Sequence, residues 1–387
     1  RGQTDRHDRE AGVVISFVVP TRNRPERLAQ TLDRLGRLTV GEPCEVVVVD
    51  NASDEPARVP GVLANGTVCR VIRLDHNAGA AARNVAVEAS SPETDWIVML
   101  DDDSHPVESV EPFAATVDRL RERPDSVAAV MADIHLPALG RRESGGLPEV
   151  FIGCGVAIRR GAFLAVGGYD ASFGYYVEEY DLAARFLQRG WSVAFDPAFC
   201  VHHHKIEAGR DMDLILHRLI RNNGWVMQRY APEAFRRPML REQRRRYRDI
   251  AEREHAIAGF TSGLIELRRT LRSQRREPMP ERVWDRFTGL AHARDALARA
   301  WAERPFASAA IVEPGKNAWA VAGAIAELTE RLGVVLTTAD SAEVMVVGTM
   351  SPGPMLDAAE RWGQQGRRVV SPWGVARVSV QGQTLAA

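Results

Sequence analysis

The feature that most restricts the fold of this chain is a repeated alternation between short apolar runs and helix-like segments. Between Val13 and Val201, runs rich in β-branched residues recur, and several are apolar almost throughout. Such runs suit strands that are buried on both faces of a mostly parallel sheet. The runs cover residues 13–20, 44–50, 69–74, 96–103, 127–133, 150–158 and 192–201.

Helical patterns fill the first connections between these runs. In residues 24–38, Leu28, Leu32 and Leu35 recur at helical spacing, and residues 79–89 are rich in alanine. An order of strand, helix and strand predicts an α/β fold.

The second half of the chain follows two other patterns. From about His204 to Glu303 no strand pattern remains, and strand–helix alternation returns afterwards. Helices are predicted at 213–230, 239–273 and 280–302, separated by Pro232, Pro238 and Pro278, and again at 317–332 and 354–364. Strands are predicted at 308–314, 334–338, 343–349 and 367–373. We therefore expect a main domain (1–205), a helical extension (206–303) and a small C-terminal α/β domain (304–387).

Composition restricts the class of protein. The 387 residues are 45% hydrophobic and 26% charged, as in ordinary globular proteins. No apolar run reaches the 18 to 20 residues of a membrane span, and residues 1–12 are too charged for a signal peptide. The four cysteines are widely spaced, which fits a reducing compartment. We expect a cytoplasmic protein, with peripheral contact to the inner face of the membrane left open.

Basic residues are concentrated in one region. Residues 205–286 hold 20 Lys and Arg against 12 Asp and Glu, although the whole chain has a net charge of −1. The stretch Arg236–Arg248 could attract an anionic acceptor, a phospholipid surface or an acidic carrier protein, or it could be a solvated helix face with internal salt bridges. A chain near neutrality with no recognised nucleic-acid module argues against nucleic-acid binding.

Three consecutive carboxylates follow the predicted strand at 96–100. Asp101, Asp102 and Asp103 stand at its carboxyl end, where open α/β sheets bind ligands. Like charges this close repel one another unless a cation or backbone amides neutralise them. The triplet alone fits a cation site and an acidic turn before a helix cap at Ser104 about equally well.

Four further segments surround this triplet in a fixed order. PTRNRPERL follows the first strand, DNASD follows the second, NAGAAARN covers 77–84, and GGYDASFGYYVEEYDLAARFLQRG begins at Gly167. In this order the five segments resemble the inverting nucleotide-sugar glycosyltransferases of family 2. The resemblance covers residues 13–205 and implies a GT-A domain, which has a Rossmann-like, mixed and mostly parallel sheet.

The resemblance also implies a donor site. Asp101 and Asp103 would be the outer members of the family's DxD motif, with Asp101 towards the ribose and Asp103 on a divalent metal, Mn²⁺ or Mg²⁺. The implied nucleotide-sugar residues are Pro20, Thr21, Arg22, Asp50, Asn51, Asn77, Arg83, Asp101 and Asp102. Asn51 stands where many relatives carry Asp, which leaves UDP, dTDP and GDP open. Asp50 as a turn cap and Arg83 as a surface residue are the alternatives.

The acidic start of the helix after Val177 matches the family's ED-x-D-L-x-x-R pattern. Residues 178, 181 and 185 share a helix face, so Glu178, Asp181 and Arg185 are expected to form an internal ion pair while Glu179 points elsewhere. The resemblance implies that Glu179 is the catalytic base, in a position that is usually Asp. Glu178 is the next candidate, and Asp181 completes the catalytic set.

Three histidines end the strand predicted at 192–201. Side chains alternate along a strand, so His202 and His204 should face one way and His203 the other. The family has one histidine near this position in its metal site. Counting from Pro197 favours His203, whereas alternation alone does not choose, and an exposed polar strand end is the alternative. The candidate metal ligands are Asp101, Asp103, His202, His203 and His204.

The sequence thus predicts a metal-dependent inverting glycosyltransferase acting in bacterial surface-glycan or natural-product glycosylation. Its acceptor would be a glycan, a small molecule or a carrier-bound intermediate. A sugar nucleotidyltransferase is the enzymatic alternative, but PTRNRPERL is not the GxGxRxxP loop that it needs. A non-catalytic GT-A-like scaffold is the other. The tail lacks a phosphate loop, and exposed Trp362, Trp373 and Val375 would suit acceptor docking or a homo-oligomer.

Overall fold

The computed structural model describes residues 15–109, 111–205 and 210–372. The chain forms two compact units, of which the first ends at Phe287 and the second begins at Thr288. The sequence analysis assigned residues up to 303 to the helical extension, whereas helix α10 (Leu290–Glu303) belongs to the second unit. Trp373 and Val375 lie outside the described residues.

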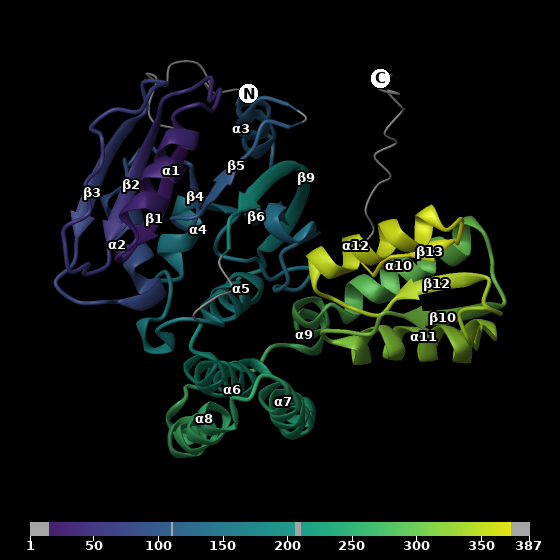
Figure 1. Ribbon diagram of the computed structural model, residues 1–387. Coiled ribbons are helices and arrows are strands. Elements are labelled where there is room, and N and C mark those ends of the chain that lie inside the picture. The colour runs from purple at the N-terminus through teal and green to yellow at the C-terminus, as the bar shows by residue number, and fades with distance from the viewer. Residues whose placement is uncertain (1–14, 110, 206–209, 373–387) are drawn as a thin grey trace, which may run out of the picture. The chain divides into compact units, whose positions relative to one another are not determined.

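The first unit contains a mixed sheet, as predicted, with the strand order β3-β2-β1-β4-β8-β6-β9-β5 (Figure 1). Neighbours β3, β2, β1 and β4 run parallel, as do β6 and β9, whereas β8 and β5 are antiparallel to their neighbours. The strands are β1 Ile15–Thr21, β2 Cys44–Asp50, β3 Val68–Arg73, β4 Trp96–Met99, β5 Ser104–Pro106, β6 Val127–Leu136, β8 Val156–Arg159 and β9 Ser192–His203, and β7 Arg141–Arg142 pairs with β6.

Helices cover both faces because the central strands are apolar on both sides. All seven residues of β2 are buried, and so are all four of β4. In α1 (Pro25–Leu35), Leu28, Leu32 and Leu35 are buried in the main core, as their spacing predicts. The remaining helices around this sheet are α2 Ala82–Ala89, α3 Phe113–Arg121, α4 Arg160–Ala165 and α5 Glu178–Gln188.

In the first unit, two strand predictions are clearly longer than the strands observed. The run at 96–103 leaves the sheet after Met99, because the carboxylates that follow form a turn. The run at 150–158 is strand only from Val156, since Gly153 and Gly155 lie in the loop before it. The short strand β5 was not predicted, because only three residues, Ser104–Pro106, pair with β9.

Four helices complete the first unit: α6 Met212–Tyr230, α7 Glu233–Arg253, α8 Ile257–Thr270 and α9 Glu281–Thr288, the last residue of which already belongs to the second unit. Pro238 lies inside α7 and does not end a helix as predicted. A proline this near the helix start removes one amide–carbonyl bond, which the rest of the helix can compensate. The predicted helix at 239–273 instead breaks at 254–256, where His255 has a φ of 54°.

In the second unit, helices α10, α11 (Ala318–Leu332) and α12 (Pro352–Gln364) accompany a parallel sheet of order β11-β10-β12-β13. Its strands are β10 Ser308–Val312, β11 Val335–Leu336, β12 Val344–Val347 and β13 Val369–Val370. The expected exposure of Trp362 is wrong: its ring packs on the small core and its Nε1 donates to Glu313 Oε1 at 2.9 Å. None of the helices in the described part of the chain has the length and apolar character that a membrane span needs.

Glycines allow α8 to approach α6 closely. A methyl group on Gly263 would lie 2.3 Å from the carbonyl oxygen of His217 in α6. We therefore expect Gly263→Ala to destabilise the first unit by about 1–3 kcal/mol through overpacking. Urea unfolding followed by circular dichroism measures this change. Gly161→Ala in α4, where no atom lies within 4 Å, is the control and should be neutral or stabilising; equal midpoints for the two variants would contradict the prediction.

Candidate functional site

The candidate site lies at the carboxyl ends of the central parallel strands. Thr21 ends β1, and the turn Asp101–Asp103 follows the neighbouring strand β4. The Thr21 hydroxyl donates to Asp102 Oδ2 at 2.8 Å, and the Thr31 hydroxyl of α1 donates to the Asp102 carbonyl at 2.8 Å. The acidic turn is therefore tied to both elements that begin the domain.

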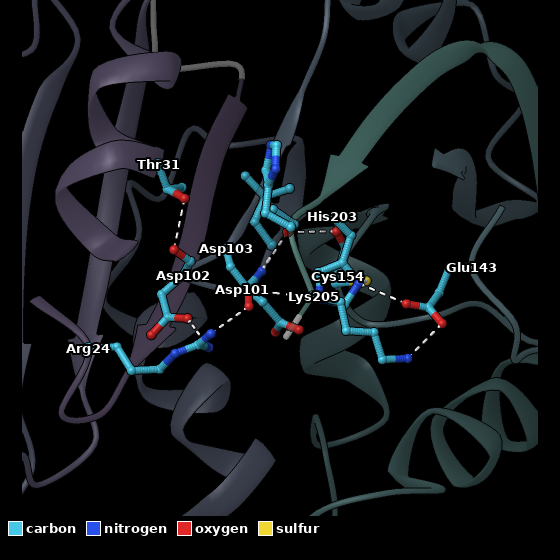
Figure 2. A network of polar contacts seen from close by, with 12 residues as sticks. Arg24, Thr31, Asp101, Asp102, Asp103, Glu143, Cys154, His203 and Lys205 are labelled. Atoms are coloured by element: carbon cyan, nitrogen blue, oxygen red, sulfur yellow. Dashed lines mark hydrogen bonds and ion pairs between the residues drawn. The ribbon is translucent and has the colours of Figure 1, made fainter. Parts of the chain in front are cut away.

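One guanidinium group bridges two of the three carboxylates. Arg24 lies 2.5 Å from Asp102 and 2.6 Å from Asp103, as Figure 2 shows. Burial raises the pKa of Asp102 to about 7, although Arg24 and Thr21 act against this. Burial acts in the same direction on Asp103, but His203 and Arg24 outweigh it and hold its pKa well below the usual range. Arg24 lies in the PTRNRPERL motif and was not among the predicted site residues.

Asp101 has a different partner. Arg83 forms an ion pair with Asp101, and its Nη2 also donates to the Leu100 carbonyl at 3.2 Å. Arg83 is only 3% exposed, so the surface alternative for this residue is wrong. The Asp101 side chain keeps 22% of its surface accessible, which leaves it open to a ligand.

His203 faces the acidic turn. Its Nε2 lies 3.3 Å from Asp103 Oδ1 and its Nδ1 lies 2.9 Å from Glu143 Oε2, while Lys205 Nζ pairs with the other Glu143 oxygen at 2.9 Å (Figure 2). Burial disfavours the imidazolium, but Cys154, Asp103 and Glu143 outweigh it and raise the pKa of His203. His203 and Lys205 lower the pKa of Glu143 to about 2 despite its burial.

Side-chain alternation separates the three histidines as predicted. His203 is the one that contacts Asp103, whereas His202 and His204 lie with His105 on the other face of β9. Glu143 and Lys205 escaped the sequence analysis, because neither belongs to a motif and only the fold brings them to His203.

These side chains fit a hard divalent cation. Ligand atoms of Asp101, Cys154 and His203 lie within 4.8 Å of one another, and Asp103 is in contact with His203. Carboxylate oxygens with one imidazole suit Mn²⁺ or Mg²⁺. Burial raises the pKa of the Cys154 thiol, which keeps the sulfur protonated and unsuited as a ligand.

The acidic helix α5 begins from a strained loop. Tyr176 and Val177 have φ values of 72° and 73°. The side-chain amide of Asn222 in α6 donates to three backbone carbonyls of this loop. The distances are 3.1 Å to Phe173, 3.2 Å to Tyr175 and 2.7 Å to Tyr176. The helical extension thus holds the loop from which the two glutamates project.

Glu178 and Glu179 occupy different surroundings. Glu178 is 4% exposed, and its Oε2 has no hydrogen-bond partner among the described residues. Glu179 is half-buried and its Oε1 accepts a hydrogen bond from the Gly153 amide at 3.3 Å. Burial raises the pKa of both carboxyls, and for Glu178 the neighbouring Glu179 charge adds to the effect.

Asp181 is part of a buried ion cluster. Its Oδ2 accepts from Arg185 Nε at 2.9 Å, and its Oδ1 accepts from Arg229 at 2.8 Å and from the Tyr230 hydroxyl at 2.6 Å. The predicted pair with Arg185 is present, but Glu178 is not part of it, because Arg229 and Tyr230 of α6 fill the space around Asp181. This carboxylate is 1% exposed, which fits a positioning residue.

Comparison with known proteins identifies this part of the chain. Residues 16–134 match the model of glycosyl transferase family 2. The chain thus carries a family 2 glycosyltransferase domain. The matched range runs from β1 into β6, so α5 and the histidines of β9 lie beyond it.

The similarity to known proteins differs in extent from one protein to the next. N-acetylglucosaminyl-diphospho-decaprenol L-rhamnosyltransferases of two Mycobacterium tuberculosis strains are 42% identical over 55 residues, which is 14% of this chain and 18% of theirs. GalNAc-T7, solved with UDP, GalNAc and Mn²⁺, is 17% identical with a TM-score of 0.44, over 58% of this chain and 49% of that one. Staphylococcus aureus TarS 1–349 is 16% identical with a TM-score of 0.44, over 83% and 92%. The Pyrobaculum calidifontis mannosyltransferase PcManGT, solved with GDP-Man and Mn²⁺, is 16% identical with a TM-score of 0.42, over 82% and 87%.

In the family 2 domain, two predicted nucleotide-binding residues hold the backbone. Asp50 accepts hydrogen bonds from the amides of Ser53 at 2.8 Å and Ala57 at 2.9 Å, so it is a turn cap, the stated alternative. Asn51 donates to the Gly79 carbonyl at 3.1 Å and accepts from the Ala78 amide at 2.8 Å. Both side chains fix the backbone of the loops at this edge of the sheet.

The remaining predicted donor residues lie at the same edge. Pro20 is half-buried in β1, beside Thr21. Arg22 is exposed, with its Nε donating to the Ala52 carbonyl at 3.3 Å. Asn77 is exposed, and its Oδ1 accepts from the Gly79 amide at 2.9 Å. Arg22 and Asn77 therefore have surface that a donor could contact.

We expect Asn222→Ala to loosen the loop before α5. The carbonyls of Tyr175 and Tyr176 lose their side-chain donor, while Arg221 still donates to that of Phe173 at 3.0 Å, and the loss should cost about 1–3 kcal/mol of stability. Hydrogen exchange of the amides at 173–177 should become faster in the variant. Leu214→Ala, at an exposed position of the same helix, is the control and should leave this exchange unchanged. Equal exchange in both variants would show that Asn222 does not hold the loop.

Proposed function

We propose that this chain is a metal-dependent inverting glycosyltransferase that moves a sugar from a nucleoside diphosphate to an acceptor hydroxyl. The observation that supports this most is the convergence of the Asp101–Asp103 turn with His203 at the carboxyl edge of a family 2 domain. The acidic start of α5 belongs to the same region, since Asp101 and Arg83 both act on the pKa values of Glu178 and Glu179.

The first half of the mechanism is the stabilisation of the leaving group. Asp101, Asp103 and His203 would hold Mn²⁺ or Mg²⁺, which when bound stabilises the negative charge that develops on the departing diphosphate. Arg83 keeps Asp101 in place, and Glu143 orients His203 through Nδ1. Arg24, whose side chain is 37% exposed, can turn from the carboxylates towards a phosphate.

The second half is the activation of the acceptor. In a single displacement, the acceptor oxygen forms a bond to the anomeric carbon as the bond from that carbon to the diphosphate oxygen breaks, and the configuration inverts. Glu179 takes the proton of the hydroxyl. Its half-buried position gives it access that the buried Glu178 lacks, and its raised pKa suits a base that works near neutral pH.

Donor and acceptor are proposed by class. UDP, dTDP and GDP sugars are the candidate donors, and a glycan, a small molecule or a carrier-bound intermediate is the candidate acceptor, in surface-glycan or natural-product glycosylation. Thermal shift with each nucleotide, with and without Mn²⁺, distinguishes the donors, because a ligand at 100 times its Kd adds about 2.7 kcal/mol of stability. Stabilisation by none of the three would count against the proposal.

The three-domain division of roles is part of the proposal. We assign catalysis to residues 1–205, support of α5 to the helical extension, and acceptor docking or homo-oligomer assembly to residues 304–387. We also propose a cytoplasmic location, with peripheral contact to the inner face of the membrane left open.

Removal of one carboxylate should weaken the binding of the metal ion. Asp103→Asn is expected to weaken Mn²⁺ binding by about 100-fold or more, because it loses a charged ligand next to His203. Isothermal titration with Mn²⁺ measures this change, and titration with nucleotide in the presence of Mn²⁺ measures the metal-dependent binding of nucleotide. Asp118→Asn, an exposed aspartate on α3, is the control. Full transfer activity of the wild-type protein in EDTA would contradict the metal assignment.

Removal of the base should affect turnover more than binding. Glu179→Gln is expected to lower kcat by about 10²- to 10⁴-fold and to keep donor affinity. The base works when deprotonated, so wild-type kcat/KM should fall as the pH drops through the raised pKa of Glu179, and the variant should lose this limb. Glu88→Gln, exposed on α2, is the control. A comparable loss in Glu178→Gln with an active Glu179→Gln would assign the base to Glu178.

A further inference from the structure

A second cluster of side chains that could bind a metal ion lies next to the candidate site. In the antiparallel register of β5 and β9, His105 stands directly opposite His202, and His204 follows two residues later on the same face. Ligand nitrogens of these three histidines lie within 4.8 Å of one another. His203 points to the opposite face, so the cluster is separate from the Asp101–Asp103 turn.

The spacing within the cluster matches a coordination polyhedron. His105 Nε2 and His204 Nε2 are 3.2 Å apart. Two nitrogens bound to one tetrahedral Zn²⁺ at about 2.0–2.1 Å would be about 3.3–3.4 Å apart. The two imidazoles thus already stand at nearly the separation that a shared metal ion requires.

The hydrogen bonds of His105 leave the right nitrogen available. Its Nδ1 lies 2.8 Å from the Pro106 carbonyl and can only donate to it. The lone pair is therefore on Nε2, which faces the cluster. A backbone carbonyl that holds the second ring nitrogen is a common support of metal-bound histidines.

The guanidinium group of Arg34 already contacts two of the three histidines. Nη1 of Arg34, from α1, lies 2.8 Å from His105 Nε2 and also contacts His204 Nε2. Guanidinium only donates, so both Nε2 atoms accept and each directs a lone pair into the cluster. Arg34 is half-buried. Because its side chain is long, a bound metal ion would displace the guanidinium group towards solvent.

We propose that His105, His202 and His204 form a second metal site, which takes a transition-metal ion of the Zn²⁺ and Co²⁺ class. Three imidazoles without a carboxylate select these ions over Mg²⁺ and Mn²⁺. A solvent molecule would complete the tetrahedron. Because His105 lies in β5 and His202 in β9, with His204 directly after it, the ion would cross-link the strand that follows Asp103 to the strand that ends at His203.

Titration of the tag-free full chain with Co²⁺, followed by the visible absorption of tetrahedral Co²⁺, tests the site. We expect one equivalent of this absorption in the wild-type protein and in Asp103→Asn, since the site is independent of the acidic turn. His105→Gln/His202→Gln should weaken Co²⁺ binding at this site by about 100-fold or more. His76→Gln, an exposed histidine paired with Asp75, is the matched control.

A variant with the opposite expected effect covers the case in which the double histidine variant fails to fold. Arg34→Met removes the competing cation and should tighten Co²⁺ binding by about tenfold. No tetrahedral absorption in the wild-type protein, its loss in Asp103→Asn, its persistence in the folded double variant, or unchanged affinity in Arg34→Met would each overturn the proposal.

Discussion

Mutual repulsion of three adjacent carboxylates is the constraint on which the site depends. Asp102 and Asp103 are almost fully buried, where a charge is costly unless it is paired. The compensating groups come from separate parts of the chain: Arg24 precedes α1, Arg83 lies in α2, and His203 ends β9. The acidic turn therefore fixes the position of three elements as well as its own conformation. A domain that lost one of these partners would have to protonate a carboxylate or expose it.

The same charge balance explains how the site can bind a cation without rebuilding itself. Arg24 and His203, whose pKa its neighbours Cys154, Asp103 and Glu143 raise, neutralise Asp103. A divalent ion would supply this positive charge, and His203 without its proton would then serve as a ligand. Glu143 and Lys205 remain as a paired support behind the imidazole. The total charge at the site would be unchanged if the ion replaced both the His203 proton and the Arg24 guanidinium.

The positions of the strand ends could be predicted from the sequence, because they depend on local sequence patterns. Strand direction places Asp101–Asp103 at the carboxyl edge of the sheet, and alternation separates His203 from His202 and His204, although the family spacing was needed to favour His203. Sequence reasoning failed where a role depends on distant partners. Asp181 is saturated by Arg229 and Tyr230, and Asp50 is used by two backbone amides. Glu143 and Asn222 belong to no motif, since their contacts follow from the packing of loops and helices that periodicity does not determine.

At the end of strand β9, side-chain alternation places neighbouring histidines in different electrostatic surroundings. Its last residue, His203, faces buried carboxylates and is held protonated by them, whereas His202 and His204, one position away on either side, face Arg34 and other imidazoles. Identical side chains therefore carry different charges within three residues, because alternation exposes them to opposite electrostatic surroundings. A triple histidine at a strand end is for this reason two separate features: one imidazole that belongs to the acidic turn, and two that are available to a cluster on the other face.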